Sequence, residues 1–225
     1  MKKKAICLIS GGLDSAVTSY IAKNRGYDIY AITFRYGQRH AKEISSSKLI
    51  SDSLKSKKHI YFDINLEQFK GSSLLDRTKK IEENRLEKIG EKIPSTYVPA
   101  RNTIFLSIAL AYAEVEKADA IFIGVTATDF SGYPDCRPEY IKSYQKMADL
   151  ATKRAVEGRP VKIMTPLIDL SKSDIIKKGI KLKVPFEKTW SCYRGGKKAC
   201  GKCDSCKLRL KGFKKAGYED PLEYK

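Results

Sequence analysis

Residues 4–24 read KAICLISGGLDSAVTSYIAKN, and this stretch decides the fold class. Residues 4–9 are mostly apolar, which predicts a short buried strand. Residues 14–24 place apolar side chains on one stripe, which predicts a helix that Gly26 ends. This alternation continues and is typical of a parallel sheet with right-handed crossovers. The next expected elements are a strand at 28–34, a helix at 41–54 and a strand at 59–64.

The alternation resumes in the second half of the chain, after a charged stretch at 65–95 that we expect to be a surface excursion. We therefore expect an α/β fold, a doubly wound parallel sheet over residues 1–186, followed by a small metal-binding region at 187–225. The elements expected after the excursion are helices at 101–115, 138–156 and 172–178 and strands at 120–125 and 161–164.

The composition is that of a folded globular chain, with 225 residues, 42% hydrophobic and 31% charged. No apolar run reaches the roughly 20 residues that a membrane span requires. The apolar run near the N-terminus is too short for a signal peptide and is interrupted at residues 10–12. We therefore expect a cytoplasmic protein with no membrane partner.

The segment SGGLDS at residues 10–15 joins the first strand to the first helix. Its glycines let the backbone approach a ligand closely, and N–H groups at a helix N-terminus form an anion site. Ser10 and Ser15 add hydroxyl donors, and Asp14 can shape the loop or bind a magnesium ion that bridges phosphates. The spacing matches neither the Walker A motif nor the dinucleotide fingerprint. It favours a phosphate site of another kind over a plain strand-to-helix turn.

Four of the six cysteines lie close together near the C-terminus. Two overlapping C-x-x-C turns can place thiolates on one tetrahedral ion, and zinc accepts four sulfurs. An iron–sulfur cluster is the alternative, but the following cysteine and proline of the ferredoxin run are missing. A closed four-sulfur site has no open position for water, so we expect a structural zinc. The expected ligands are Cys192, Cys200, Cys203 and Cys206.

Positive charge is high, with 44 Lys and Arg against 26 Asp and Glu and a net charge of +18. Nucleic acids and nucleotides are partners that such a surface could attract. The lysines are scattered, however, and part of the charge near the cysteines compensates four thiolates. Nucleic-acid binding by the cysteine region stays open as an alternative.

The SGGLDS loop resembles the pyrophosphate loop of the N-type ATP pyrophosphatases, which split ATP between the α and β phosphates. Together with four further stretches and the cysteines, it resembles the 7-cyano-7-deazaguanine synthase family of the queuosine and archaeosine pathways. The resemblance covers almost the whole chain and is weak only at 65–95. The four stretches are FRYGQRH at 34–40, YVPARN at 97–102, SGYPDCRPE at 131–139 and TWSCY at 189–193.

The resemblance implies an ATP-dependent ligase that converts 7-carboxy-7-deazaguanine and ammonia to the nitrile, releasing AMP and pyrophosphate. It implies ATP with Mg²⁺ as cofactor, one structural Zn²⁺, small-molecule partners and a homodimer, with nucleic acid not required. Adenylation makes the carboxylate oxygen a leaving group for ammonia, and the amide is then adenylated and loses AMP. The protein has to position ligands and stabilise charge, and needs no nucleophile of its own.

The resemblance also implies residue roles around ATP. Lys172 is expected to contact a phosphate, and Arg101 a phosphate or the substrate carboxylate. With Asp14 and Ser15, these two are the candidate catalytic residues. The residues expected to bind ATP are Ile9, Ser10, Gly11, Gly12, Leu13, Asp14, Ser15 and Ala16.

The substrate is expected at the carboxyl ends of the strands, where open α/β sheets bind ligands. Tyr36 can stack on a purine-like ring. Asp135 can accept hydrogen bonds from the guanine-like donor edge, although it can also simply cap a turn. The expected substrate residues are Tyr36, Gln38, Arg39, Asp135 and Arg137.

Two departures from the family pattern stand out. Arg35 replaces an aspartate, which indicates either a shifted substrate or a different surface pair, and Lys183 replaces a glycine in a turn. Two alternative functions remain. A tRNA-thiolating ATP pyrophosphatase would want a reactive cysteine pair, yet Cys7 lies on a buried strand and Cys136 is alone. A non-catalytic nucleic-acid-binding module would need only the basic face.

Overall fold

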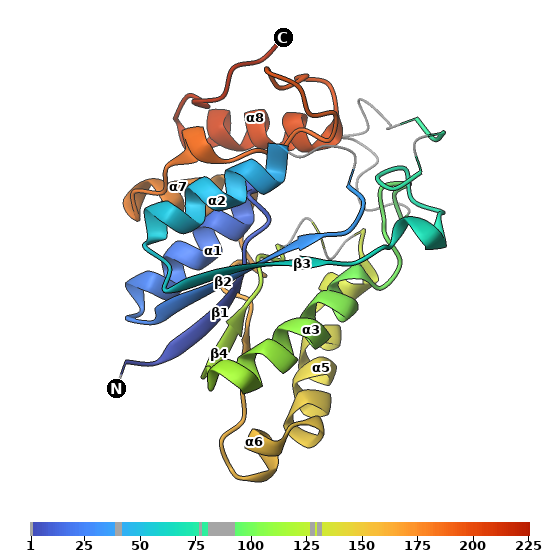
Figure 1. Cartoon of the computed structure of the whole chain (residues 1–225). Helices are drawn as coiled ribbons and strands as arrows, with labels where there is room; N and C mark the ends of the chain where they lie inside the picture. The colour runs from blue at the N-terminus through green and yellow to red at the C-terminus, as the bar shows by residue number, and fades with distance from the viewer. Residues whose placement is uncertain (1, 39–41, 77, 81–92, 127–128, 130–131) are drawn as a thin grey trace.

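The sheet is parallel throughout, with strand order β3-β2-β1-β4-β5 (Figure 1). The computed structural model describes residues 2–38, 42–76, 78–80, 93–126, 129 and 132–225. All five strands of this sheet lie where the sequence predicts them, with ends that differ by at most three residues. The strands are β1 (Lys4–Leu8), β2 (Asp28–Arg35), β3 (Lys58–Asp63), β4 (Ala120–Phe122) and β5 (Lys162–Met164).

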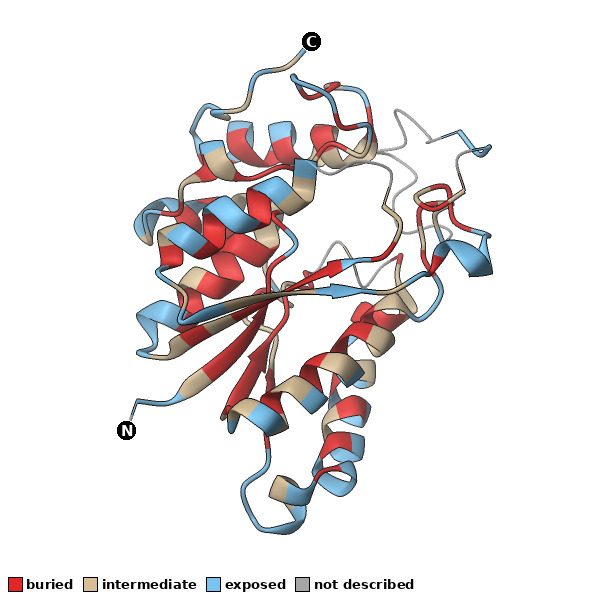
Figure 2. Cartoon of the chain, in the orientation of Figure 1, coloured by how far each residue is buried: buried red, intermediate tan, exposed pale blue. Residues whose placement is uncertain are grey.

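Helices cover both faces of the sheet, which confirms the doubly wound fold (Figure 1). Two clusters of buried side chains, one on each face, form the core, and Figure 2 shows the central strands almost wholly buried. On one face lie α1 (Leu13–Asn24), α2 (Lys42–Leu54), α7 (Lys172–Lys181) and α8 (Asp204–Ala216). On the other lie α3 (Arg101–Glu116) and α5 (Pro138–Ala151), followed by the short α6 (Lys153–Val156). Among the described residues, no helix is both long and apolar enough to span a bilayer.

The connections leave β1 in two directions. β2 and β3 follow on one side of it, and β4 and β5 on the other. In an open α/β sheet, the crevice at such a switch point, outside the carboxyl ends of the strands, is where ligands bind. The loop at residues 9–12 follows β1 directly, so the topology places the predicted phosphate site at this crevice.

Two helix predictions need correction. The helix expected at 138–156 is broken at Thr152, whose backbone is extended (φ −118°, ψ 142°) and whose hydroxyl accepts from the Ala155 N–H to begin α6. α8 was not predicted, because its many lysines and the charged Arg209 weaken the apolar periodicity. Its buried face is formed by Cys206, Arg209, Phe213 and Ala216.

The segment at 65–95 is only partly a surface excursion. Leu66 and Leu75 are buried in the cluster under α3, and Ser72 and Ser73 are fully buried. Residues 81–92, which carry most of the charge, lie outside the described residues. A few residues of the segment therefore belong to the core, while most of its described residues are exposed, as a surface excursion requires.

α8 is fastened to the rest of the chain by the side chain of Arg209, which is only 2% exposed. Its guanidinium forms an ion pair with Asp220 (Nε to Oδ2, 2.8 Å) and also donates to the Thr189 hydroxyl (2.7 Å) and the Phe186 carbonyl (3.1 Å). A buried charge is tolerated only when paired and hydrogen-bonded. The network therefore holds residues 186–191 against α8.

We predict that Asp220→Ala lowers the free energy of unfolding by about 3–5 kcal/mol, because it leaves the buried Arg209 charge without a counterion. The matched control is Asp63→Ala, whose ion pair with Arg35 is exposed (46% and 70%) and should contribute less than about 1 kcal/mol. Urea unfolding can be followed by the fluorescence of Trp190, the single tryptophan. Equal losses in the two variants would contradict the prediction.

Candidate functional site

Hydrogen bonds of its own two serines fix the shape of the loop after β1. The Ser15 hydroxyl accepts from the Ser10 N–H (3.2 Å) and hydroxyl (3.0 Å) and donates to the Gly12 carbonyl (3.0 Å). The Gly12 N–H in turn donates to Ser10 Oγ (3.2 Å). The loop thus closes on itself at the N-terminus of α1, with the Ser10 and Gly12 N–H groups bonded to its own serines.

Gly11 is the position in this loop that requires a glycine. Its φ is +88°, and a Cβ there would overlap the Glu43 carbonyl oxygen and lie 2.7 Å from the Ser47 nitrogen of α2. Gly12 has an ordinary φ of −77°. Gly124, after β4, is a second close approach, since its Cβ would lie 3.0 Å from the Asp14 carbonyl carbon. Backbone of α2 and of the segment after β4 therefore packs closely against residues 11–15 on two sides.

Lys172 and Asp14 form an ion pair beside the loop. Lys172 Nζ lies 2.7 Å from both carboxylate oxygens of Asp14, and the two side chains are 16% and 27% exposed. Lys172 is thus not a solvated surface lysine, and the structure brings together two of the four candidate catalytic residues.

A cavity of about 260 Å³ opens beside this loop at the carboxyl ends of the strands. The loop and the aromatic side chains of Phe34, Tyr36 and Phe105 supply part of its wall. Of the predicted residues, the cavity is lined by Ile9, Ser10, Gly12, Asp14, Ser15, Tyr36, Gln38 and Arg101. It is not lined by Gly11, Leu13, Ala16, Asp135, Arg137 or Lys172, and Arg39 lies outside the described residues.

Arg101 lies inside the cavity, at the first residue of α3. Its guanidinium donates to the Tyr36 hydroxyl (3.4 Å) and lies 5.8 Å from the centre of that ring. The Tyr36 ring packs edge-on against Phe105, which stacks on Phe34 with ring centres 4.0 Å apart. Arg101 therefore presents a positive charge beside an aromatic wall.

Gln38 supports this wall. Its side-chain oxygen accepts from the Tyr36 N–H (2.8 Å), and its amide donates to the Phe34 carbonyl (3.2 Å). Both hydrogen bonds hold the turn after β2, so the side chain positions Tyr36.

Asp135 serves as a helix cap in the structure. Its Oδ2 accepts from the Asn102 N–H (2.8 Å) in the first turn of α3, and the side chain is buried. Arg137 is exposed. The Pro134–Cys136 turn carries the Asp135 carboxylate to the open N–H groups of α3, a contact between distant segments that local sequence does not reveal.

Glu43, Asp129 and Tyr193 are among the cavity residues that were not predicted from the sequence. Burial raises the pKa of Glu43 to about 7. The positive charge of Arg101 lowers this pKa, and Cys192 raises it further. Burial also raises the pKa of Asp129, while Lys172 lowers it and Asp14 raises it. Glu43 lies three residues after the FRYGQRH stretch, and Asp129 follows the apolar strand β4. The position of each acidic residue after a predicted strand could have marked it as a site candidate.

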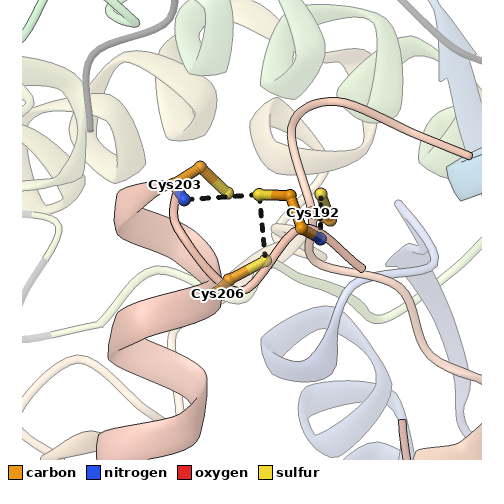
Figure 3. Close-up of side chains that lie close together, drawn as sticks. Cys192, Cys203 and Cys206 are labelled. Carbon is orange, nitrogen blue, oxygen red and sulfur yellow. Dashed lines mark hydrogen bonds between the residues drawn. The ribbon is translucent and has the colours of Figure 1, made fainter. Parts of the chain in front are cut away.

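The four predicted zinc ligands come together in the structure. Their sulfur atoms all lie within 4.8 Å of one another, with Cys200 and Cys206 4.0 Å apart. Figure 3 shows three of them, Cys192, Cys203 and Cys206, facing one point. Sulfurs bound to one tetrahedral zinc lie about 3.8 Å apart. Backbone N–H groups of Cys200 and Lys202 point at sulfurs of the group, as is usual around metal-bound thiolates.

The cysteine region touches the loop directly. The Trp190 N–H donates to the Gly11 carbonyl (2.8 Å), and the indole N–H donates to the Cys192 carbonyl (3.0 Å). Tyr193 follows and lines the cavity. The cysteine region therefore forms part of the wall of the site.

Arg35 lies away from the cavity. It pairs with Asp63 of β3 at 2.9 Å on the surface, so the charge reversal at this position makes a surface pair. Lys183 has a φ of +56°, which explains why a glycine suits this turn.

The sequence of this chain is similar to that of a known protein family. The family model described as "Queuosine biosynthesis protein QueC" matches residues 4–217. The chain belongs to this family. A relative in Syntrophus aciditrophicus named 7-cyano-7-deazaguanine synthase is 55% identical over 98% of this chain and 96% of its own length. One with the same name in Hydrogenovibrio crunogenus is 53% identical over 99% and 96%.

A solved structure confirms the fold of the QueC-family chain. The NMN synthetase of Francisella tularensis is 15% identical, with a TM-score of 0.52 over 97% of this chain and 79% of its own. The resemblance inferred from the motifs is thus confirmed at the level of the family, the enzyme class and the fold.

We predict that Gly11→Ala is far more destabilising than Gly158→Ala. Both positions have positive φ (+88° and +78°), which costs about 1–2 kcal/mol with a side chain. A Cβ at Gly158 meets nothing within 4 Å, whereas one at Gly11 overlaps α2 and should add about 1–3 kcal/mol. Thermal unfolding of both variants measures the difference. Similar losses would show that α2 does not constrain the loop.

We predict that Cys203→Ser weakens metal binding by more than about 100-fold, since changes beyond the ligands already cost 10–100-fold. The control is Cys7→Ala, because Cys7 lies on β1 outside the cysteine group. Elemental analysis should find zinc in the control and in the unaltered protein. Iron with acid-labile sulfide would instead support the cluster alternative, and unchanged metal content in Cys203→Ser would contradict the site.

Proposed function

We propose that the chain is an ATP-dependent ligase that converts 7-carboxy-7-deazaguanine and ammonia to 7-cyano-7-deazaguanine. The names of its relatives support the product. The observation that carries the ATP-dependent part is the SGGLDS loop, which presents an anion site beside a cavity that holds Arg101. The end product of the pathway, queuosine or archaeosine, lies beyond this step.

In this proposal the loop at residues 10–15 binds the pyrophosphate that leaves ATP. Its N–H groups and the N-terminus of α1 stabilise the charge that develops there. Lys172 pairs with Asp14 beside the loop, where its ammonium can donate to a phosphate, and Asp14 is a carboxylate that suits Mg²⁺. Magnesium, when bound, neutralises the phosphate oxygens.

Arg101 is proposed to hold the substrate acid or the α phosphate. Its charge lies in the cavity beside Tyr36, where a planar ring can pack on the aromatic wall. Fixing the acid oxygen against the α phosphate makes the adenylation effectively unimolecular. Ammonia then displaces AMP, and the resulting amide goes through a second adenylation and elimination to the nitrile.

The four cysteines are proposed to hold one structural zinc, as the closed sulfur arrangement supports. The division of the chain at residue 186, a cytoplasmic location and a homodimer are proposed with it. In this proposal nucleic acid is not required for the reaction, and the product serves queuosine biosynthesis, which the family model names.

The thiolating alternative is disfavoured by the state of the two remaining cysteines. Burial raises the pKa of Cys7 to about 12. Cys136 lines the cavity, but burial raises its pKa and its sulfur accepts from the Asn102 amide (3.0 Å). Thiols held neutral in this way are poor nucleophiles.

The test is to incubate the purified protein with ATP, Mg²⁺, ammonium and 7-carboxy-7-deazaguanine and to identify the products by mass. We expect the nitrile, with two AMP and two pyrophosphate for each nitrile formed. ADP as the nucleotide product would refute the role of the loop. Thiolated tRNA in a parallel reaction with a sulfur donor would support the alternative function instead.

A further inference from the structure

The ring of the proposed substrate needs an acceptor that the residues assigned so far do not provide. A guanine-type ring presents N1–H and a 2-amino group side by side, and a carboxylate accepts from both at once. Asp135, the residue expected for this task, is buried and already accepts from the N–H of Asn102. Because Asp135 also does not line the cavity, the acidic side chains that do are better placed to accept from the ring.

Three acidic side chains line the cavity within the described part of the chain: Asp14, Glu43 and Asp129. Asp14 is paired through both oxygens with Lys172. Asp129 accepts through Oδ2 from the Thr126 N–H (3.0 Å) and hydroxyl (2.9 Å). Both lie near the phosphate loop, and both already have partners.

Glu43 differs from these two. It lies in the first turn of α2, and no hydrogen bond or ion pair to its carboxylate is found within the residues that the structure describes. The charge that acts on it most strongly is that of Arg101, another residue of the cavity wall. The Glu43 side chain is half-buried, so part of its hydration is already lost, and a ligand that brings two donors can replace that water at its carboxylate.

The wall between Glu43 and Arg101 suits a flat ring. Phe34, Tyr36 and Phe105 form an aromatic cluster that lines the same cavity. In a 7-carboxy-7-deazaguanine the acid group lies on the five-membered ring and the donor edge on the six-membered ring. The ring can therefore present its acid to Arg101 and its donors to Glu43.

We propose that Glu43 determines the specificity for the deazaguanine ring, with its carboxylate accepting hydrogen bonds from N1–H and the 2-amino group. This inference rests on the proposed function for the identity of the substrate. It assigns Glu43 to ring binding and leaves ATP binding to the loop.

The test compares Glu43→Gln with the unaltered protein in two measurements. One is calorimetric binding of 7-cyano-7-deazaguanine, and the other is turnover of 7-carboxy-7-deazaguanine. We expect the variant to bind the ring roughly 10–100-fold more weakly, since a charged acceptor is replaced by a neutral one with a misplaced donor. The KM for ATP should not change. Glu139→Gln is the matched control, because Glu139 is exposed at the start of α5.

The same measurements with the analogue that lacks the 2-amino group separate recognition from general damage. The unaltered protein should discriminate against the analogue about tenfold or more, and Glu43→Gln should discriminate much less. Glu43→Asp, which keeps the charge, should keep part of the discrimination and serves if the Gln variant does not fold. Equal discrimination in all variants would overturn the proposal. Failure of the unaltered protein to form the nitrile would instead refute the proposed function, while the binding measurements still test Glu43.

Discussion

The site depends on the close approach of three backbones at Gly11. The loop passes α2 at a distance that leaves no room for a Cβ, and on its other side the Trp190 N–H donates to the Gly11 carbonyl. The hydroxyls of Ser10 and Ser15 complete the loop from within. Because backbone supplies most of these contacts, the shape of the anion site follows from how β1, α2 and residues 189–193 pack together.

Much of the fold could be predicted because its signals are local. Each strand is an apolar run, and the glycine loop and the cysteine spacing are short motifs whose chemistry depends on near neighbours. The break at Thr152 and helix α8 were missed for a different reason. The buried stripe of α8 includes Arg209, which looks like a surface residue in sequence but is only 2% exposed in the structure.

The site was harder to predict than the fold, because its partners are distant in sequence. Asp135 lies 33 positions from the helix that it caps, and Lys172 lies 158 positions from Asp14. Motif spacing cannot reveal which carboxylates already accept hydrogen bonds from protein groups. The pocket carboxylate Glu43 became a candidate only when the partners of Asp14, Asp129 and Asp135 were known.

The pairing of Lys172 with Asp14 has a consequence for how a nucleotide enters. The lysine packs under α8, where a Cβ at Gly212 would lie 2.5 Å from its Cγ, so its stem has little freedom to swing away. An incoming magnesium nucleotide carries both an anion for the lysine and a cation for the aspartate. In the proposed function, nucleotide entry is therefore an exchange of partners in which neither side chain loses its countercharge.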